Sequence, residues 1–319
     1  MQLPPSLRAA IDRELHGIPL ADLTRAADAL SQRYRAEVQD GRMHLSDDAA
    51  ARAYLTTRLP ATFAATSAAL AAVAGARSDF APRTVLDAGA GPGTASWAAV
   101  HHWSTLESAT LVEGSPAIRA IGERLGLPLA HVSWVAGKLG TALDLSRRDL
   151  VLLAYVLDEL PETAREALIR QLWTLTGDAL VIVEPGTPAG WKRILHARDL
   201  LIQAGAHILA PCPHARPCPL AAPDWCHFSA RVARSRLHRE AKGGTVPWED
   251  EKFIYIAASR QPGTQPEARV IAPPRTSKAA VTLKLCQEDG YAADRVYAKR
   301  AGDSFKIARR LDWGDIVRK

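Results

Sequence analysis

Five short apolar runs, separated by stretches of helical periodicity, constrain the fold of this chain more than any other feature of its sequence. Each run is too short for a helix, and apolar residues recur at helical spacing in the longer segments between them. Strands that alternate with helices in this way form a parallel sheet with helices on both faces. The sequence therefore predicts an α/β fold with a doubly wound sheet. The runs lie at residues 84–86, 109–112, 131–135, 150–153 and 179–183.

The first part of the chain is expected to be helical. Leu7, Ile11 and Leu15 recur at helical spacing and Ala-rich segments continue the pattern, so residues 1–80 are predicted to form an N-terminal helical region. Near the start there is no basic segment followed by an apolar one, and no run approaches the roughly 18 apolar residues that span a membrane. These observations predict a cytoplasmic protein that does not insert into membranes.

The rest of the chain divides at a linker rich in Pro, Gly and Gln, residues 261–266. We expect the sheet domain over residues 81–260. Within it, residues 211–226 form a Pro- and Cys-rich loop, because a packed helix or a central strand does not tolerate so many prolines. Residues 268–319 alternate apolar and basic side chains, which predicts a small, basic, β-rich C-terminal appendage.

A glycine-rich loop, Asp87-Ala88-Gly89-Ala90-Gly91-Pro92-Gly93, follows the first predicted strand. Glycines at this place let the backbone approach a ligand closely, because they have no Cβ. The spacing distinguishes between ligands. A dinucleotide site has the pattern Gly-x-Gly-x-x-Gly, and here the third glycine falls one position too early. The loop therefore disfavours NAD.

The arrangement Asp-x-Gly-x-Gly-x-Gly resembles the first motif of class I S-adenosylmethionine-dependent methyltransferases. That resemblance implies that the aspartate faces the methionine end of the cofactor and that the glycines pass beneath it. Glu113 ends the next predicted strand, where a carboxylate can accept both ribose hydroxyls of an adenosine. Tyr155 follows the fourth strand, at the sheet edge where α/β folds bind ligands. The predicted cofactor-binding residues are Asp87, Gly89, Gly91, Gly93, Glu113 and Tyr155.

All of the cysteines lie in the C-terminal part of the chain, and proline directly follows two of them, as in the ligand loops of iron–sulfur proteins. Four thiolates suit either a [4Fe-4S] cluster or a tetrahedral zinc ion. The spacing is not the C-x2-C of zinc ribbons and favours a cluster, with zinc and unconnected thiols as the alternatives. His214 and His227 keep a mixed Cys/His zinc site open. The predicted metal ligands are Cys212, Cys218, Cys226 and Cys286.

The charge distribution points to a polyanionic partner for one part of the chain. The composition, 47% hydrophobic and 23% charged, excludes a disordered or fibrous protein. The net charge is +6, but residues 191–319 hold 23 basic and 13 acidic residues and so carry +10. RNA is the simplest partner for such a region, and a solvated basic face is the alternative. The predicted phosphate contacts are Arg231, Arg234, Arg236, Arg239 and Lys242.

These basic residues follow the third cysteine directly, and their arrangement depends on local structure. If the stretch is helical, Arg231, Arg234, His238 and Lys242 share one face and Arg236 points elsewhere. Such a patch contacts phosphates and does not read a base sequence.

Three acidic residues at strand ends are the candidates for catalysis. The Asn/Asp-Pro-Pro-aromatic motif of amine methylation is absent after the fourth strand, and cytosine C5 chemistry needs a thiolate that metal binding would occupy. Asp158, Glu159 and Glu184 can accept protons there, although acids at such positions also cap helices or contact cofactors.

Several further segments together resemble a known family. They are VEGSPA at 112–117, EPGTP at 184–188, CPH at 212–214, CP at 218–219, WCHF at 225–228, EDEKF at 249–253 and WGD at 313–315. The chain resembles, over roughly residues 50–319, the methyltransferase-like assembly factors of the mitochondrial small ribosomal subunit and their bacterial relatives. The resemblance implies a class I methyltransferase core, binding to small-subunit ribosomal RNA during assembly, and a [4Fe-4S] cluster on the four cysteines.

Three functions stay open on this basis. The first is a methyltransferase that modifies small-subunit rRNA, and the second is a catalytically silent assembly factor that binds S-adenosylmethionine and clamps rRNA. The third is a small-molecule methyltransferase with an unrelated zinc site. It is disfavoured because a small substrate does not require an extended basic region. The expected partner is the small ribosomal subunit with its 16S-type rRNA, and the free protein is expected to be a monomer.

Overall fold

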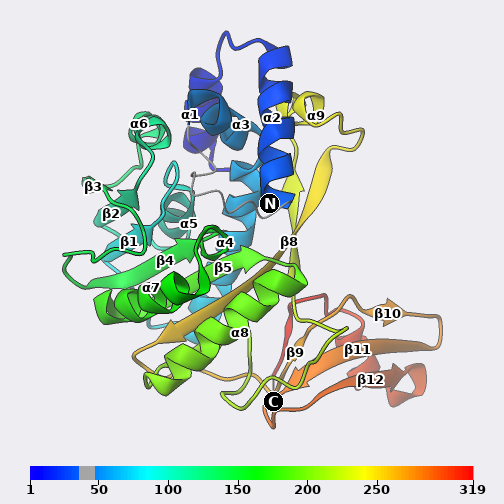
Figure 1. Cartoon of the computed structure of the whole chain (residues 1–319). Coiled ribbons are helices and arrows are strands. Elements are labelled where there is room, and N and C mark those ends of the chain that lie inside the picture. Colours follow the sequence, from blue (N-terminus) through cyan, green and yellow to red (C-terminus); the bar gives the residue numbers. More distant parts are fainter. Residues whose placement is uncertain (36–46, 319) are drawn as a thin grey trace.

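The computed structural model describes residues 1–35 and 47–318 of the chain (Figure 1). Helices occupy the described parts of the region before residue 80, as predicted, and residues 36–46 of that region lie outside the described residues. The helices in this region are α1 (Pro5–Glu14), α2 (Leu20–Arg35), α3 (Asp48–Thr57) and α4 (Leu59–Ala76).

The central sheet is built from strands that begin at Thr84. The strands are β1 (Thr84–Ala88), β2 (Ser108–Glu113), β3 (His131–Ala136), β4 (Arg148–Ala154), β5 (Thr176–Pro185), β6 (His207–Ala210), β7 (Phe228–Ala233) and β8 (Trp248–Ser259). The helical segments between them are α5 (Thr94–His102), α6 (Pro116–Leu125), η1 (Leu157–Glu159), α7 (Glu162–Leu175), α8 (Pro188–Gln203) and α9 (Arg236–Ala241).

The order of these strands is β3-β2-β1-β4-β5-β8-β6, and β7 pairs with β8 outside this path. Strands β1 to β5 are parallel, and β8 runs antiparallel to both of its neighbours, β5 and β6. A doubly wound sheet with one reversed strand in this position has the class I methyltransferase-like topology. The predicted fold class is confirmed. The strand order reverses beside β1, so the loops after β1 and β4 meet where such sheets bind ligands.

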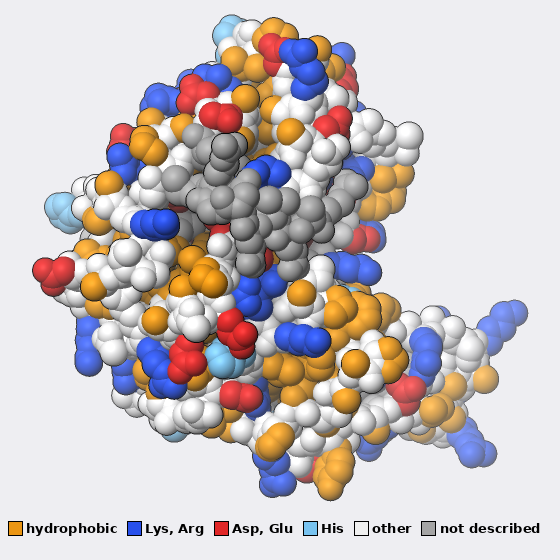
Figure 2. Space-filling model, viewed as in Figure 1, with side chains coloured by type: hydrophobic (Ala, Val, Ile, Leu, Met, Phe, Trp, Pro, Cys, Tyr) orange, Lys and Arg blue, Asp and Glu red, His pale blue; other side chains and the backbone are white. Residues whose placement is uncertain are grey.

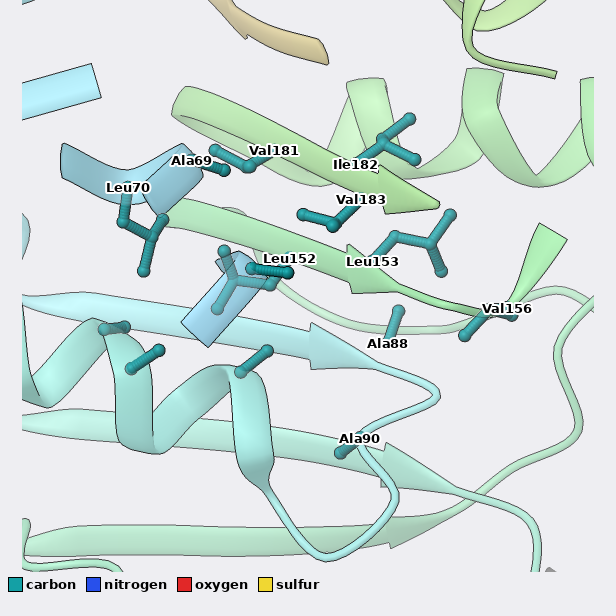
Figure 3. Close-up of a cluster of buried hydrophobic side chains, with 14 of the residues drawn as sticks. Ala69, Leu70, Ala88, Ala90, Leu152, Leu153, Val156, Val181, Ile182 and Val183 are labelled. Carbon is teal, nitrogen blue, oxygen red and sulfur yellow. The ribbon is translucent and has the colours of Figure 1, made fainter. Parts of the chain in front are cut away.

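Apolar side chains cover both faces of the central strands, which explains why these strands appear in the sequence as continuous apolar runs. Figure 3 shows Leu152 and Leu153 of β4 and Val181 of β5 in this core, with Leu70 of α4 beside them. Because the core fixes strand positions, it also fixes where each loop at the carboxyl edge begins.

Helix α4 contradicts the expectation that no segment approaches the length and apolarity of a membrane span. Its 18 residues include no charged side chain, so by length and composition it could cross a membrane. In the structure 61% of the residues of this helix are buried, and the helix packs against α5, β7 and β8. Phe63 and Leu70 are almost completely buried. We therefore describe α4 as a core helix.

A second, smaller sheet follows the linker, in agreement with the predicted β-rich C-terminal region. It contains β9 (Ala268–Val270), β10 (Arg275–Thr276), β11 (Ala280–Gln287), β12 (Ala292–Ala298) and β13 (Ile316–Val317), with η2 (Lys299–Ala301) and α10 (Asp303–Ala308) after β12. The pairing within this sheet is antiparallel. It has its own apolar core, in which Leu283 and Leu285 pack with Phe305 of α10. The division into domains at residues 80, 260 and 268 stays a prediction.

The first turn of α8 packs tightly against the end of β5. Thr187 caps this helix by accepting a hydrogen bond from the Gly190 N–H at 3.1 Å. A Cβ at Gly190 would lie 2.0 Å from the carbonyl oxygen of Pro185, which is backbone and cannot rotate away. Glycine at this position therefore lets α8 begin directly beside Glu184.

We predict opposite effects for two glycine-to-alanine substitutions in helices. Gly190→Ala should lower the free energy of unfolding by about 1–3 kcal/mol, because the methyl group clashes with the end of β5. Gly75→Ala in α4 meets nothing within 4 Å and should raise it by about 0.5–1 kcal/mol, because alanine restricts the unfolded chain more than glycine does. Urea unfolding measures both. Equal effects would contradict the proposed packing.

Candidate functional site

The glycine loop after β1 adopts a backbone that L-residues rarely adopt. Gly89, Gly91 and Gly93 have φ angles of 69°, 54° and 82°. A Cβ at Gly89 would lie 2.7 Å from a methyl carbon of Val156, and a Cβ at Gly93 would lie 3.1 Å from Leu111. Gly93 then caps α5. The backbone angles therefore favour glycine at all three positions, and close packing is a second reason at Gly89 and Gly93.

Glu113 lies at the end of β2 and holds the glycine loop. Its Oε2 accepts a hydrogen bond from the Gly91 N–H at 2.8 Å, and its Oε1 accepts one from the Ser115 N–H at 2.7 Å. The side chain is almost buried, and this burial raises the pKa of its carboxyl group. Each carboxylate oxygen has a second lone pair, so Glu113 can still accept hydroxyl groups from a ligand.

Asp87 binds the start of α5. Its Oδ2 accepts hydrogen bonds from the backbone N–H of Ser96 at 3.0 Å and from the Ser96 hydroxyl at 2.8 Å. Burial raises the pKa of Asp87 to about 6, while these two hydrogen bonds act in the opposite direction. Asp87 therefore connects β1 to the helix that follows the loop. Its contact with the methionine end of a cofactor stays a prediction.

Tyr155 is held in place at the carboxyl end of β4. It is a non-glycine residue with φ of 59°, and its hydroxyl donates a hydrogen bond to Oε1 of Glu251 at 2.9 Å. Arg58 forms an ion pair with the same carboxylate at 3.2 Å and lies over the Tyr155 ring. Arg58 precedes α4 and Glu251 belongs to β8. Sequence reasoning assigned neither residue a role, although Glu251 is in the EDEKF segment.

The three catalytic candidates have different surroundings. Glu184 is fully buried, forms a 2.7 Å ion pair with Arg193 of α8, and accepts a hydrogen bond from the Leu157 N–H at 3.0 Å. Burial and the charge of Asp158 raise the pKa of Glu184, and Arg193 acts in the opposite direction. Asp158 is buried, whereas Glu159 is exposed. Glu184 thus joins β5, η1 and α8, and a catalytic role for any of the three stays a prediction.

The structure brings the four cysteines together around one small cavity of about 30 Å³. Cys212, Cys218 and Cys226 come from the loop between β6 and β7, and Cys286 comes from β11 of the C-terminal sheet. All of them are free thiols. Trp191 of α8 also lines the cavity. The cavity therefore lies between the central sheet and the C-terminal sheet.

The cysteine side chains influence one another electrostatically. Burial raises the pKa of Cys218, Cys226 and Cys286, the last to about 12, and the repulsion that a second thiolate at Cys212 would exert acts in the same direction at each of the three. His214 lies in the same cavity, with its Nε2 3.4 Å from the Sγ of Cys286. Four thiolates at this place therefore need a positively charged partner.

Within the described part of the chain, no group of three or more His, Cys, Asp or Glu side chains is arranged to hold a single metal ion. A single zinc ion requires donors about 2.0–2.3 Å from one centre. The thiolates around a [4Fe-4S] cluster are farther apart, because each binds a different iron. The observed arrangement gives no preformed zinc site, and it does not by itself show a cluster.

Two buried arginines hold the cysteine loop by its backbone. Arg198 of α8 donates hydrogen bonds to the carbonyl oxygens of His214 at 3.0 Å and Arg216 at 2.6 Å. Arg269 of β9 donates to the carbonyl oxygens of Pro211 at 2.5 Å and Gly314 at 2.7 Å. Their charges lower the pKa of Cys286, against the larger effect of burial. Neither arginine could be recognised from the sequence, because the backbone groups that they bind lie 16 to 58 residues away.

An aromatic stack connects the same loop to the end of the chain. The rings of Trp225 and His227 are stacked with centroids 5.1 Å apart, and Trp313 meets His227 edge-on at 4.7 Å. Trp225 also donates a hydrogen bond to the carbonyl oxygen of Gly186 at 3.1 Å. The WCHF and WGD segments, which are distant in the sequence, therefore pack together.

The residues predicted to contact RNA lie on β7 and around α9. The shared face of Arg231, Arg234, His238 and Lys242 was expected only if this stretch is helical, and most of it before Arg236 is not. Arg231 belongs to β7, Arg234 lies between β7 and α9, and α9 begins only at Arg236. The strand forms because β8 supplies a pairing partner, which helical periodicity does not consider.

Most of these basic side chains form ion pairs with carboxylates. Arg231 pairs with Asp250 at 2.8 Å, and Arg236 pairs with Glu240 at 2.7 Å. For Arg239 the described residues include no ion-pair partner. The five predicted residues thus do not form an open patch of cations.

Glu249 of β8 is the centre of this charge cluster. It pairs with Arg234 at 2.9 Å and Lys242 at 3.1 Å, and the Nε2 of His238 lies 3.3 Å from its Oε1. Burial alone would raise the pKa of Glu249, but these three neighbours hold it well below its usual range. Arg234 and Lys242 are also largely buried, so both have a structural partner.

A family described as mitochondrial small ribosomal subunit Rsm22 matches residues 48–318. The human mitochondrial ribosome assembly protein METTL17 is 31% identical, over 83% of this chain and 61% of its own length. The Rsm22-cox11 tandem protein 2 of Schizosaccharomyces pombe, also mitochondrial, is 25% identical over 83% of this chain and 42% of its own length. The chain thus spans about three fifths of the human relative.

Solved structures with a similar fold are more distant. Magnesium protoporphyrin IX methyltransferase from Synechocystis, with bound S-adenosylmethionine, has a TM-score of 0.41 at 16% identity and covers 75% of this chain and 97% of its own. The N-methyltransferase NodS from Bradyrhizobium japonicum has a TM-score of 0.42 at 13% identity. The match covers 72% of this chain and 97% of the NodS chain.

The relatives also correct the expected location. The predicted cytoplasmic location is contradicted, because the curated relatives are described as mitochondrial proteins. The family resemblance noted in the sequence is confirmed over most of the chain. This chain belongs to the family described as mitochondrial small ribosomal subunit Rsm22.

Proposed function

We propose that this protein is an assembly factor of the small ribosomal subunit that binds S-adenosylmethionine and ribosomal RNA and holds a metal centre on its four cysteines. The family match over residues 48–318 is the observation that carries the proposal. It agrees with the human relative, which is named a ribosome assembly protein. The net charge of residues 191–319 supports a nucleic-acid partner, because 23 basic residues there exceed 13 acidic ones.

The cofactor site rests on the carboxyl edge of the central sheet. Gly89, Gly91 and Gly93 would pass under the cofactor, Glu113 would accept its ribose hydroxyls, and Asp87 would face its methionine end. The left-handed glycine backbone and the position of the Glu113 carboxylate fit such a ligand. S-adenosylmethionine, when bound, supplies an electrophilic methyl group. Tyr155, held by Glu251, would form a side of the site toward β8.

Methyl transfer is a narrower proposal than cofactor binding. A base methylation needs a positioned acceptor and often a proton acceptor. Glu184 is occupied by a buried ion pair with Arg193. This pairing favours the catalytically silent assembly factor over a methyltransferase that uses Glu184 as its base.

The cysteine cavity supports a metal centre with four thiolate ligands. Cys212, Cys218, Cys226 and Cys286 line one cavity, although no three of the described side chains are arranged around a single ion. We propose a [4Fe-4S] cluster, with zinc as the alternative. Four thiolates with a cluster carry a net negative charge, and the buried guanidinium groups of Arg198 and Arg269 offset part of it.

The proposed centre would also be a structural joint. Cys286 is on β11, while the other ligands belong to the loop before β7. Metal binding would therefore connect the C-terminal sheet to the central sheet, and its binding free energy would become folding free energy for this junction.

The function itself is tested on small ribosomal subunits with labelled S-adenosylmethionine. We expect the purified protein to bind immature subunits and to bind the cofactor. Labelled methyl groups in the rRNA would assign the methyltransferase, and cofactor binding without labelling would assign the silent assembly factor. Absence of subunit binding, with the protein folded and metal-loaded, would refute the proposed function.

Glu113→Gln should weaken S-adenosylmethionine binding about tenfold, which corresponds to the loss of one charge-assisted hydrogen bond of roughly 1.5 kcal/mol. Glu107→Gln is the matched control, because Glu107 is exposed, precedes the start of β2 and pairs with Arg83. Isothermal titration calorimetry measures both affinities. If the two variants bind the cofactor equally well, Glu113 is not a cofactor ligand.

Cys286→Ser should remove the metal and loosen the C-terminal sheet, while leaving the glycine loop unchanged. Anaerobically purified wild-type protein should contain about four irons with matching sulfide and absorb near ~400 nm, and the variant should lose both. Amide exchange should become faster in residues 268–318, and S-adenosylmethionine affinity should stay the same. Zinc in the wild-type protein would replace the cluster assignment. A loss of cofactor affinity with the metal would contradict the proposed independence of the two sites.

A further inference from the structure

A second group of basic side chains lies at the end of β12, away from the residues that the sequence singled out. Residues 299–310 contain five basic side chains and one acidic side chain, Asp303. All five basic residues are exposed. Figure 2 shows Lys and Arg side chains projecting from the part of the molecule that the C-terminal sheet occupies, at the lower right. We call this group the outer basic face, and it consists of Lys299, Arg300, Lys306, Arg309 and Arg310.

The outer basic face differs from the predicted group in how its charges are paired. Lys306 forms an ion pair with Asp303 at 2.9 Å. In residues 1–35 and 47–318, the other four basic side chains of this face have no carboxylate within ion-pair distance. In the predicted group, four of five side chains have such a partner. A phosphate that approaches four of the five cations in the predicted group must therefore displace a carboxylate or lie beside one, whereas at the outer basic face this holds for Lys306 alone among the described contacts.

A small apolar anchor fixes the direction in which these charges point. Phe305 and Ala308 of α10 are buried in the core of the C-terminal sheet, against Leu283 of β11. Lys306 and Arg309 follow these two residues in the sequence and are exposed to solvent. Ile307 is 60% exposed beside them, which leaves an apolar contact for a ribose or a base. The charges are thus carried by a packed element of the sheet.

We propose that the outer basic face is the surface through which this protein contacts the phosphates of small-subunit rRNA, and that residues 231–242 are mainly structural. The proposal rests on the proposed function, which supplies RNA as the partner. Its physical basis is that unpaired cations release bound counterions when they meet phosphates, whereas paired cations first have to give up a carboxylate.

A protein partner is the competing interpretation of this region. Strand β12 pairs only with β11 among the described strands, so its outer edge can accept a further strand. Tyr291 and Val296 are also highly exposed there. Strand addition uses backbone hydrogen bonds and does not depend on the charges of Arg309 and Arg310. The two partners can therefore be separated by removing charge.

The test compares three double variants that each remove two exposed arginine charges. Arg309→Ala/Arg310→Ala changes the outer basic face, and Arg231→Ala/Arg236→Ala changes the group predicted from the sequence. Arg83→Ala/Arg170→Ala is the control, because these exposed arginines lie elsewhere on the central sheet and its helices. The probe is an in vitro transcript of small-subunit rRNA, and binding is measured across a range of salt concentrations. Thermal unfolding verifies that each variant is folded.

We expect Arg309→Ala/Arg310→Ala to weaken binding roughly tenfold or more and to reduce the salt slope by about 2, one unit for each lost phosphate contact. The other two variants should bind like the wild-type protein. If all three variants bind rRNA equally weakly, the effect comes from net charge alone and the proposal is overturned. A larger effect of Arg231→Ala/Arg236→Ala would also overturn it. If Arg309→Ala/Arg310→Ala binds rRNA like the wild-type protein but binds small subunits more weakly, the outer basic face contacts a protein partner and the proposal is overturned. If the wild-type protein does not bind rRNA, the proposed function fails first.

Discussion

Strand β8 is the element on which the rest of the structure depends. It pairs with β5, β6 and β7, so it joins the parallel part of the sheet to the segment that carries the cysteine loop. Acidic side chains of β8 also bind side chains from neighbouring elements. Glu251 holds Tyr155 at the cofactor edge, and Glu249 collects the basic side chains around α9. A single antiparallel strand thus fixes both the edge where a cofactor would bind and the position of a group of arginines.

The cysteine cavity depends on contacts that are independent of a metal. Arg198 and Arg269 bind backbone carbonyls on both sides of the loop, and the stack of Trp225, His227 and Trp313 closes it against the end of the chain. These contacts bring Cys286 to the loop while burial keeps its thiol protonated. The four thiols are therefore partly ordered without a metal, which would favour binding of the proposed metal centre at one shared site over binding to separate thiols.

Local patterns predicted the features that are determined locally. The apolar runs located the parallel strands, the glycine loop required left-handed backbone angles, and the cysteines came together across the linker. The sequence could not reveal that Arg231 is in a strand, because the decisive partner is β8. It could not reveal Arg198, Arg269 or the ion pair of Glu184 with Arg193 either, since these depend on how separate elements pack. The sequence predicted helix over α4, but its overall apolarity was missed because threonine and serine interrupt its apolar residues.

The basic residues show most clearly why counting charges is not sufficient to locate a binding surface. Residues 231–242 and residues 299–310 each contain five lysines and arginines. The first group lies beside β8, whose carboxylates have to be neutralised because Glu249 is itself partly buried. Arg234 and Lys242, which pair with Glu249, therefore stabilise the fold. The second group lies on and around α10, which buries Phe305 and Ala308 in the core of the small sheet and leaves its cations exposed, and one carboxylate accompanies five cations. A cation without a carboxylate partner is available to a phosphate. The three-dimensional structure is needed to show which cations these are.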